Sequence, residues 1–421
     1  MTILFGAGNF QRAFAAWMLQ RSGSGAIVVR VTDGGRYDDL ESAGWRYPVW
    51  TRGLREGRRV DEVEWVEAIE GAVYPYADFD AYLRLAERAD VDTLISNTTE
   101  AGIRYEAEPA PDGRPAASFP GKLAQWLHHR WRHFGGAAEA GVDVLPCELI
   151  KANGAALRAC VEAHARDWDY GSDFAEWLGA DCSFADTLVD RIVTGRPAAD
   201  ALAEAPSEAV RAAARTAVVA EPYHLLAVAG ASERLRTSGP LRVEGLNVVY
   251  VDDLAPLRRL KVRLLNGAHT AMVPVGLRHG VATVRAFVED PTWGPWLRGL
   301  LDEEIAPTLY GDGATGLTRI EVEAYAKTVL ERFGNPYVEH RLESILLNGF
   351  SKWPTRLGPT VGYYVQRGRA VPERLRMAWG CQLDLAEERG ATGMPDDPEA
   401  VRRFATERPR VEAIVGLGEG A

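Results

Sequence analysis

Lysine is scarce in this chain. Only five of its 48 basic residues are lysine, and all the others are arginine. Arginine stays charged at every physiological pH, whereas a lysine in a suitable environment can lose its proton near neutrality. Each lysine is therefore a candidate for chemistry that arginine cannot perform. The five are Lys122, Lys151, Lys261, Lys327 and Lys352.

Other shortages exclude whole classes of protein. No window reaches the roughly 20 uninterrupted apolar residues of a membrane helix, and the N-terminal residues do not resemble a signal peptide. The four cysteines are widely spaced, which indicates neither a disulfide framework nor a CxxC metal site. A net charge of -11 argues against a surface that coats nucleic acid. We expect a soluble, cytoplasmic protein with no membrane, nucleic-acid or obligate protein partner.

Strand-like and helix-like segments alternate in the first part of the chain. Apolar, β-branched runs predict strands at 2–5, 26–33, 91–97 and 142–145, and periodic segments predict helices at 13–19, 79–89, 121–134 and 154–165. This alternation predicts an α/β fold with a Rossmann-like parallel sheet covered by helices on both faces. We expect residues 246–251 to add one late strand to that sheet, and residues 196–220 to form exposed helix and connection.

The character of the sequence changes after about Leu254. The remainder is helical in pattern, with breaks near residues 311–316, 334–336 and 358–359. The sequence therefore predicts a Rossmann-like α/β domain over residues 1–253. A mostly α-helical domain is expected over residues 254–421.

A glycine turn follows the first predicted strand. Gly6 and Gly8 occupy the place where a dinucleotide-binding fingerprint has its tight turn and its close approach to the pyrophosphate. The third glycine of that fingerprint is replaced by Gln11. Asp33, at the end of the second strand, is the natural acceptor for the adenosine ribose, although it lies further on than usual. Two glycines that merely shape a strand-to-helix turn are the alternative.

The segment from Lys261 to His269 carries the most chemistry. At about 100° per residue, Lys261, Asn266 and His269 fall on one side of a predicted helix. A base, an amide donor and an imidazole suit removal of a proton from an alcohol and stabilisation of the developing oxyanion. A solvated polar face is the alternative, and the scarcity of lysine weighs against it.

A family resemblance rests on several motifs in a fixed order. The KxxxxNxxH pattern resembles the mannitol dehydrogenase family of polyol-specific long-chain dehydrogenases, and the finer detail resembles its tagaturonate reductase (altronate oxidoreductase) branch. The matching segments are FGAGNFQRAF (5–14), SNTTEAGI (96–103), SFPGK (118–122), LPCELI (145–150), TLVDRIV (187–193), VDD (251–253), LLNGAHTA (264–271) and RFGNPY (332–337).

The resemblance implies a zinc-independent enzyme that interconverts a ketone and a secondary alcohol with NAD. It implies that residues 1–253 form the NAD-binding domain and residues 254–421 the substrate and catalytic domain. It implies Lys261 as the general acid and base, and Asn266 and His269 as the groups that polarise the carbonyl. It also extends the cofactor site beyond the glycines and the acid. The implied cofactor-binding residues are Gly6, Gly8, Asn9, Phe10, Asp33, Asn97, Thr98 and Glu100.

The substrate implied is an open-chain sugar acid or polyol, in the first place D-tagaturonate reduced to D-altronate. Lys352 and Arg356 match cationic positions that face the substrate, and an arginine can fix a carboxylate. Asp186 stands where many relatives carry Asn or a small polar residue that helps to hold the substrate. A fructuronate reductase, a mannitol-type polyol 2-dehydrogenase and a catalytically inactive NAD-binding sensor are the alternatives. His340 is an outer candidate.

Two further patterns concern cofactor choice and metals. The charge of Asp33 would repel the 2′-phosphate of NADP, which favours NAD, although Arg30 and Arg36 lie nearby. His129 and His133 have i,i+4 metal-ligand spacing, with His128 beside them. No acidic residue completes a zinc-protease pattern there. We therefore expect no metal site.

Overall fold

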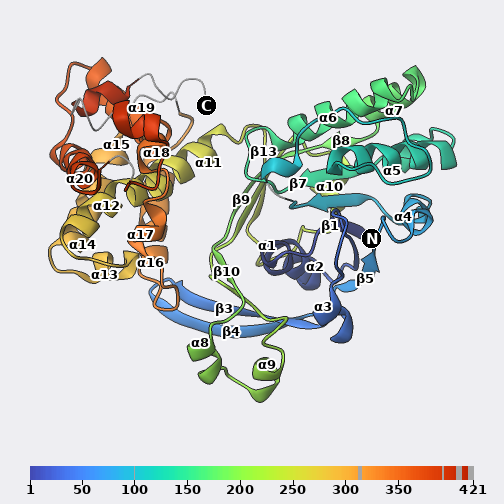
Figure 1. Cartoon of the computed structure of the whole chain (residues 1–421), viewed down its shortest axis with the longest axis horizontal. Helices are drawn as coiled ribbons and strands as arrows, with labels where there is room; N and C mark the ends of the chain where they lie inside the picture. The colour runs from blue at the N-terminus through green and yellow to red at the C-terminus, as the bar shows by residue number, and fades with distance from the viewer. Residues whose placement is uncertain (99, 312–314, 391–392, 404–409, 416–421) are drawn as a thin grey trace. The chain divides into compact units, whose positions relative to one another are not determined.

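The computed structural model describes residues 1–98, 100–311, 315–390, 393–403 and 410–415 (Figure 1). The side chains of Glu100 and Pro398 lie outside that description, so the cofactor role expected for Glu100 has no structural counterpart here. The chain forms two compact units. The first comprises Met1–Arg52 and Val60–Leu254, and the second comprises Gly53–Arg59 and Ala255–Ala421.

A six-stranded parallel sheet organises the first unit. Its strand order is β5-β2-β1-β6-β7-β8, and every described pairing in it is parallel. The strands are β1 (Thr2–Phe5), β2 (Ala26–Val29), β5 (Ile69–Val73), β6 (Thr93–Ser96), β7 (Asp143–Pro146) and β8 (Ser183–Phe184). The order reverses beside β1, which is the switch point where α/β sheets bind ligands.

Both faces of this sheet are covered, as the alternating side chains of β1 require. Leu4 packs with the helical run α1 (Asn9–Gln11), η1 (Arg12–Ala16) and α2 (Trp17–Ser22). Ile3 and Phe5 pack on the other face with α4 (Phe79–Ala86), α5 (Phe119–His133), α6 (Asn153–Asp167) and α7 (Ser172–Ala180). Figure 1 shows these two layers on opposite sides of the sheet. The predicted Rossmann-like α/β architecture is confirmed.

Two expectations about the first unit are wrong. The late strand β13 (Val248–Val251) does not join the parallel sheet; it pairs with β12 (Leu225–Ala229), which pairs with β9 (Asp186–Asp190) in a separate three-stranded sheet. An apolar strand pattern identifies a strand but not its partner. Within 196–220, the segments α8 (Ala199–Ala203) and α9 (Glu208–Ala212) are helical as expected, but β11 (Val218–Ala220) is a buried strand.

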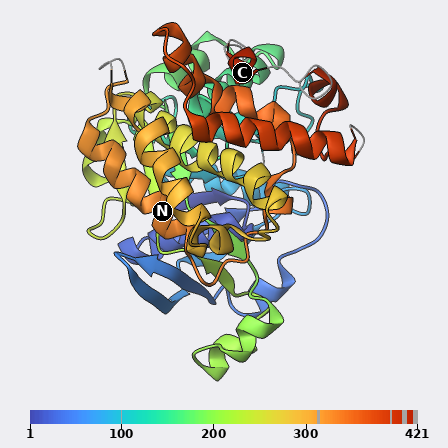
Figure 2. The same cartoon turned by 90° about the vertical axis from the view of Figure 1, so that its left-hand side faces the viewer.

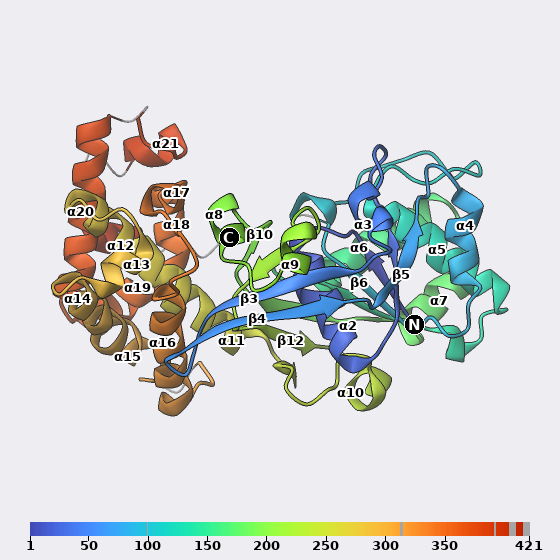
Figure 3. The same ribbon diagram turned by 90° about the horizontal axis from the view of Figure 1, so that it is seen from below.

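A long β-hairpin was not anticipated from the sequence. Strands β3 (Tyr47–Arg55) and β4 (Arg58–Val66) run side by side in a four-stranded sheet with β11 and β10 (Val193–Gly195) (Figure 3). The two residues between the strands, Glu56 and Gly57, both have positive φ, at 53° and 73°. Two-residue hairpin turns of this kind match the right-handed twist of the strands that they join.

The second unit is helical, as predicted. Its central helix α12 (Gly267–Arg278) is buried along nearly its whole length. Around it pack α17 (Leu342–Ile345), α18 (Gly349–Arg356) and the long α20 (Glu373–Arg389), which Figure 2 shows in red-orange. The remaining helices include α11 (Ala255–Leu260), α13 (Val284–Glu289), α14 (Trp293–Gly299), α16 (Arg319–Phe333) and α19 (Gly358–Gln366). In the described part of the chain, no helix is both long and apolar enough to cross a bilayer.

Gly154 tests the packing of α6 against the sheets. A Cβ at this position would lie 2.5 Å from the backbone carbonyl carbon and oxygen of Ala185, which cannot move aside. We expect Gly154→Ala to lower the free energy of unfolding by about 3 kcal/mol through overpacking. Gly380→Ala, in a helix where nothing lies within 4 Å, is the control and should raise stability by up to about 1 kcal/mol. Equal denaturation midpoints for the two variants would contradict this reading of α6.

Candidate active site

The glycine turn after β1 has the geometry that its sequence predicts. Gly6 has a φ of +99°, and an added Cβ would lie 3.6 Å from the carbonyl oxygen of Asn97. Gly8 precedes α1, and nothing lies within 4 Å of the place where its Cβ would be. The turn thus leaves an open space beside exposed backbone at the start of a helical run, where a phosphate group can approach closely.

The residues just after the glycines are held by arginine. Arg12 is buried, and its guanidinium donates to the Asn9 side-chain oxygen at 2.7 Å and to the Thr216 carbonyl at 2.5 Å. The Phe10 ring stacks on Phe14 with 4.8 Å between ring centroids. The arginine contacts keep Asn9 at the mouth of the turn, and the ring contact anchors Phe10 to the helix.

A buried carboxylate shapes the turn after β6. Glu148 is 2% exposed, and it accepts hydrogen bonds from the Thr98 N–H at 2.8 Å, the Thr98 hydroxyl at 2.9 Å and the Ser96 hydroxyl at 3.0 Å. Burial raises the pKa of Glu148, against the lowering effect of these donors. Asn97 between them donates to the Cys147 carbonyl at 2.9 Å. Glu148 therefore fixes Asn97 and Thr98, a role that sequence reasoning missed.

A cavity of about 610 Å³ opens over these turns. Five of the residues predicted to bind the cofactor line it, namely Gly6, Gly8, Asp33, Asn97 and Thr98. Asn9 and Phe10 lie beside the turn but are not among its lining residues. The volume is in the range of ordinary ligand sites, and glycine backbone with an acid beyond it is the donor and acceptor set that a dinucleotide requires.

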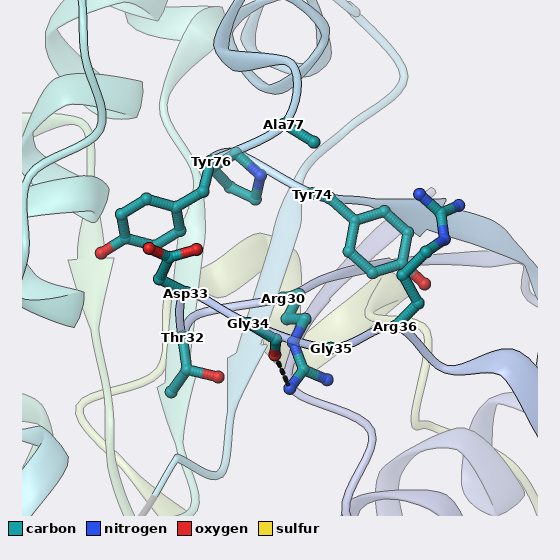
Figure 4. A pocket seen from close by; sticks show the side chains of 10 residues that line it. Arg30, Thr32, Asp33, Gly34, Gly35, Arg36, Tyr74, Tyr76 and Ala77 are labelled. Carbon is teal, nitrogen blue, oxygen red and sulfur yellow. Dashed lines mark hydrogen bonds between the residues drawn. The ribbon is translucent and has the colours of Figure 1, made fainter.

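A smaller cavity of about 250 Å³ adjoins the first, because Thr32, Asp33 and Tyr76 line both. Asp33 lies in a bend four residues beyond the end of β2. Figure 4 shows its carboxylate beside the Tyr76 ring. A carboxylate is thus present where the two cavities share lining residues.

The two arginines near Asp33 already have partners. Arg36 forms an ion pair with Glu41 at 3.1 Å, and its guanidinium lies 4.2 Å from the centre of the Tyr74 ring. Arg30 donates to the Gly34 carbonyl (Figure 4). Its guanidinium also lies over the Tyr37 ring. The hydrogen bond from Tyr74, and then the contact with Arg36, lowers the pKa of Glu41, so this acid stays charged and holds Arg36.

Asp186 has a structural task in the first unit. It begins β9, and its carboxylate accepts a hydrogen bond from the backbone N–H of Ala155 at 3.1 Å. Ala155 lies in the first turn of α6, whose N-cap residue Ala152 has no side chain that could accept this hydrogen. A carboxylate is favourable at a helix N-terminus. Asp186 therefore caps α6, whatever further role it has.

In the second unit, the segment η4 (Lys261–Asn266) is a π-helix inserted between α11 and α12. Its i→i+5 hydrogen bonding makes residues five apart neighbours across one turn. Lys261 and Asn266 therefore lie closer in angle than the roughly 140° that separates residues five apart on a regular α-helix. His269 follows one α-helical turn beyond Asn266. The helix was predicted, but its π-turn was not.

His269 lies in an apolar and positively charged environment. It is 7% exposed and stacks on Phe333 at 4.2 Å, with His340 edge-on at 4.9 Å. Burial, and then the charges of His340, Arg356, Arg332 and Lys352, lower its pKa well below the usual 6.5. Among the described residues, its Nε2 has no hydrogen-bond partner. A neutral imidazole with one open nitrogen can donate to or accept from a ligand.

Two of the cations near His269, Lys352 and Arg356, come from α18. Arg356 donates to the Thr270 hydroxyl at 3.1 Å, and burial lowers its pKa. Lys352 donates to the carbonyls of Ile345, at 3.2 Å, and of Leu347. Burial and then the charge of Arg356 lower the pKa of Lys352. Both residues are half-buried.

The histidines of α5 are engaged in other contacts. His128 stacks on Tyr170 with ring centroids 3.7 Å apart, and the His129 Nε2 lies 2.9 Å from the Glu87 carboxylate. In the part of the chain that the structure describes, no three His, Cys, Asp or Glu side chains are grouped so that they could hold a metal ion.

Comparison with known proteins agrees with this architecture. Altronate oxidoreductase from Pectobacterium atrosepticum is 37% identical and aligns with 96% of this chain and 84% of its own length. The Bacillus subtilis enzyme of that name is 36% identical, covering 95% and 82%. Mannitol 2-dehydrogenase from Pseudomonas fluorescens, solved with NAD and D-mannitol, has the same fold, with a TM-score of 0.68 at 21% identity over 96% of this chain and 84% of its own. A D-sorbitol dehydrogenase gives 0.76 at 22%, covering 94% and 83%.

Two family models together span most of the chain. The mannitol dehydrogenase Rossmann domain matches residues 1–236, and the mannitol dehydrogenase C-terminal domain matches residues 253–406. The resemblance noted in the sequence motifs is confirmed. The chain belongs to the mannitol dehydrogenase family of oxidoreductases.

Proposed function

We propose that this protein is an NAD-linked reductase that interconverts D-tagaturonate and D-altronate. In this proposal the Rossmann-like domain, residues 1–253, binds the dinucleotide, and the helical domain, residues 254–421, carries the catalytic groups. The observation that carries the proposal is the aligned set Lys261, Asn266 and His269 on one helix with two cations beside it. The altronate oxidoreductases at 36–37% identity support the substrate.

NAD is favoured over NADP by the groups around Asp33. The carboxylate would accept hydrogen bonds from the ribose hydroxyls of NAD and would repel a 2′-phosphate. Arg36, which could otherwise bind that phosphate, is bound to Glu41 at 3.1 Å and 3.3 Å. Arg30 is bound to the Gly34 carbonyl. Glycine backbone at Gly6 and Gly8 would hold the pyrophosphate, with Asn9, Phe10, Asn97 and Thr98 around it.

The catalytic roles follow from what each of the three side chains can donate or accept. When bound, NADH supplies the hydride that reduces the carbonyl carbon of the substrate. The Lys261 ammonium donates the proton that the resulting alkoxide needs, and in the reverse direction the neutral amine takes it from the alcohol. Asn266 donates its amide hydrogen to the carbonyl oxygen. His269 is neutral, so it offers one N–H to the same oxygen without adding a charge.

The substrate carboxylate would be held by Arg356 and Lys352. Burial lowers the pKa of both side chains, which reflects the cost of holding two cations close together away from water. An anionic ligand would relieve that cost, and a guanidinium can fix a carboxylate through two parallel hydrogen bonds. A sugar acid therefore suits this cluster better than a neutral polyol does.

Three substrates distinguish the proposal from its alternatives. We expect NADH to be consumed with tagaturonate most efficiently. Fructose should be reduced with a kcat/KM at least about a hundredfold lower, because it leaves the cations without their carboxylate. NADPH should be at least about tenfold less efficient than NADH because of Asp33. If fructuronate or fructose is reduced with a higher kcat/KM than tagaturonate, that compound takes the place of tagaturonate as the proposed substrate. NADH binding without turnover of any of the three would favour the inactive sensor.

Lys261→Arg tests the proton donor. Arginine keeps the positive charge but cannot readily lose its proton. We expect kcat to fall by at least about a thousandfold, within the range that a positioned acid or base contributes, while the NADH dissociation constant stays unchanged. Lys327→Arg, at an exposed position on α16, is the matched control and should retain full activity. Substantial turnover by Lys261→Arg would remove Lys261 from the role.

The buried neutral state of His269 predicts a pH dependence of stability. Because its pKa is held well below 6.5 in the folded protein, only the unfolded chain takes up this proton near pH 6.5. Below that pH the group should therefore cost about 1.4 kcal/mol of folding free energy per pH unit. We expect His269→Gln to lose less stability between pH 6.5 and pH 5 in urea denaturation than the wild type does. The slope should correspond to roughly one proton fewer taken up on unfolding. Parallel curves for the two proteins would contradict a neutral His269.

A further inference from the structure

Lys122 is a buried lysine that the catalytic proposal does not use. It lies in the first turns of α5 and has 0% exposure. Its ammonium donates to the Tyr76 hydroxyl at 2.9 Å and to the Ala117 carbonyl at 2.8 Å. Burying an ammonium is costly unless hydrogen bonds and charges compensate it. Burial lowers the pKa of Lys122 to about 8, while the carboxylates of Glu108 and Asp33 act in the opposite direction.

Tyr76 forms a wall shared by both cavities of the first unit. It follows β5 in a turn, and its ring lies beside the carboxylate of Asp33 (Figure 4). The charge of Asp33 is close enough to help raise the pKa of Tyr76, after the larger effect of burial. Besides its hydrogen bond with Lys122, the Tyr76 hydroxyl makes long contacts, at 3.4 Å, with the carbonyls of Ala116 and Ala117.

Ala117 and Ser118 form another part of the lining of the larger cavity. The Ala117 peptide is held on both sides. Its N–H donates to the Glu108 carboxylate at 2.5 Å, and its carbonyl accepts from Lys122. Glu108 also accepts from the Ser118 N–H at 3.1 Å. The ammonium is thus the link between the Ala117 side of the cavity and the Tyr76 wall.

A lysine suits this position better than the arginine that the chain uses elsewhere. An ammonium is a compact group with three donors that can point in different directions, whereas a guanidinium is a flat fork that needs more room. Lys122 is fully enclosed, and its hydrogen-bond partners Tyr76 and Ala117 belong to different segments. A lysine at this position therefore fits a residue that joins two segments through hydrogen bonds in different directions, and not a charge on the surface.

We propose that Lys122 is a positioning residue of the dinucleotide site, whose ammonium ties Tyr76 to Ala117 and so holds the Tyr76 wall against the adenosine half of the cofactor. The assignment rests on the proposed function, because Asp33 marks the adenosine side only if a dinucleotide binds there. Lys122 does not touch the reacting atoms in this scheme. It acts on cofactor affinity through Tyr76 and not on the chemical step.

The test compares Lys122→Met with Lys327→Met, which removes an exposed lysine from α16. We expect Lys122→Met to raise the dissociation constants of both NADH and AMP about tenfold, the lower end of the effect of losing a hydrogen bond to a charged group. The kcat at saturating NADH should change less than about twofold, since affinity alone is affected. Lys327→Met should have the same two dissociation constants and the same kcat as the wild type. AMP reports on the adenosine half alone.

Tyr76→Phe keeps the ring and removes only the hydroxyl, so it decides the question even if Lys122→Met does not fold. We expect Tyr76→Phe to weaken NADH and AMP binding about threefold, because one partner of the ammonium is lost. The double variant should bind no more weakly than Lys122→Met alone, since the two residues act through one contact.

Several results would overturn the inference. Lys122→Met with wild-type affinities, a fall in kcat with affinity unchanged, or fully additive losses in the double variant would each remove Lys122 from this role. If Lys122→Met does not fold, wild-type affinity in Tyr76→Phe has the same consequence. A wild-type protein that binds neither NADH nor AMP would instead overturn the proposed function together with this inference.

Discussion

The parallel pairing of β1 with β2 on one side and β6 on the other is the constraint on which the dinucleotide site depends. In this register Phe5 lies opposite Val29 and Ser96, and Ser96 lies opposite Pro146. The residues that follow all four strands therefore emerge at the same edge of the sheet. The glycine turn, the segment leading to Asp33, the Asn97 turn and the Glu148 carboxylate meet there because the backbone hydrogen bonds leave them no other place.

In the helical unit the constraint is the cost of burying polar side chains within a packed core. α12 is buried almost throughout, so any polar side chain on it loses water. His269 meets this cost by staying neutral between Phe333 and His340. On α18, Arg356 offsets the same cost by donating to the Thr270 hydroxyl, and Lys352 by donating to backbone carbonyls. An unpaired imidazole nitrogen beside two constrained cations is a costly arrangement, and such arrangements are concentrated at functional sites.

Much of the fold could be predicted from the sequence, and the exceptions have physical reasons. The strands of the parallel sheet are short apolar runs, so residues 2–5 and 142–145 were recognisable. The β3–β4 hairpin was not, because Pro48 and Gly53 interrupt one strand and charged residues dominate the other. The partner of β13 is set by tertiary packing that no local pattern contains. In the candidate site, the glycines and Asp33 carry a local signature, whereas Glu148 is notable only for its burial, which composition does not reveal. The scarcity of lysine points to Lys122, but its contacts and role depend on tertiary packing that composition does not contain.

The π-turn at Lys261–Asn266 explains why the two residues are five positions apart in the sequence. A spacing of five residues would place a base and its amide partner about 140° apart on a regular α-helix, whereas a spacing of four would keep them on the same face. One additional residue, absorbed by the wider turn, restores the alignment while the helix continues on both sides. Deleting a single residue between them would leave a better helix, yet it would shift Lys261 relative to everything that follows. Among homologous sequences, gaps should therefore be rarer within this stretch than its ordinary-looking composition suggests.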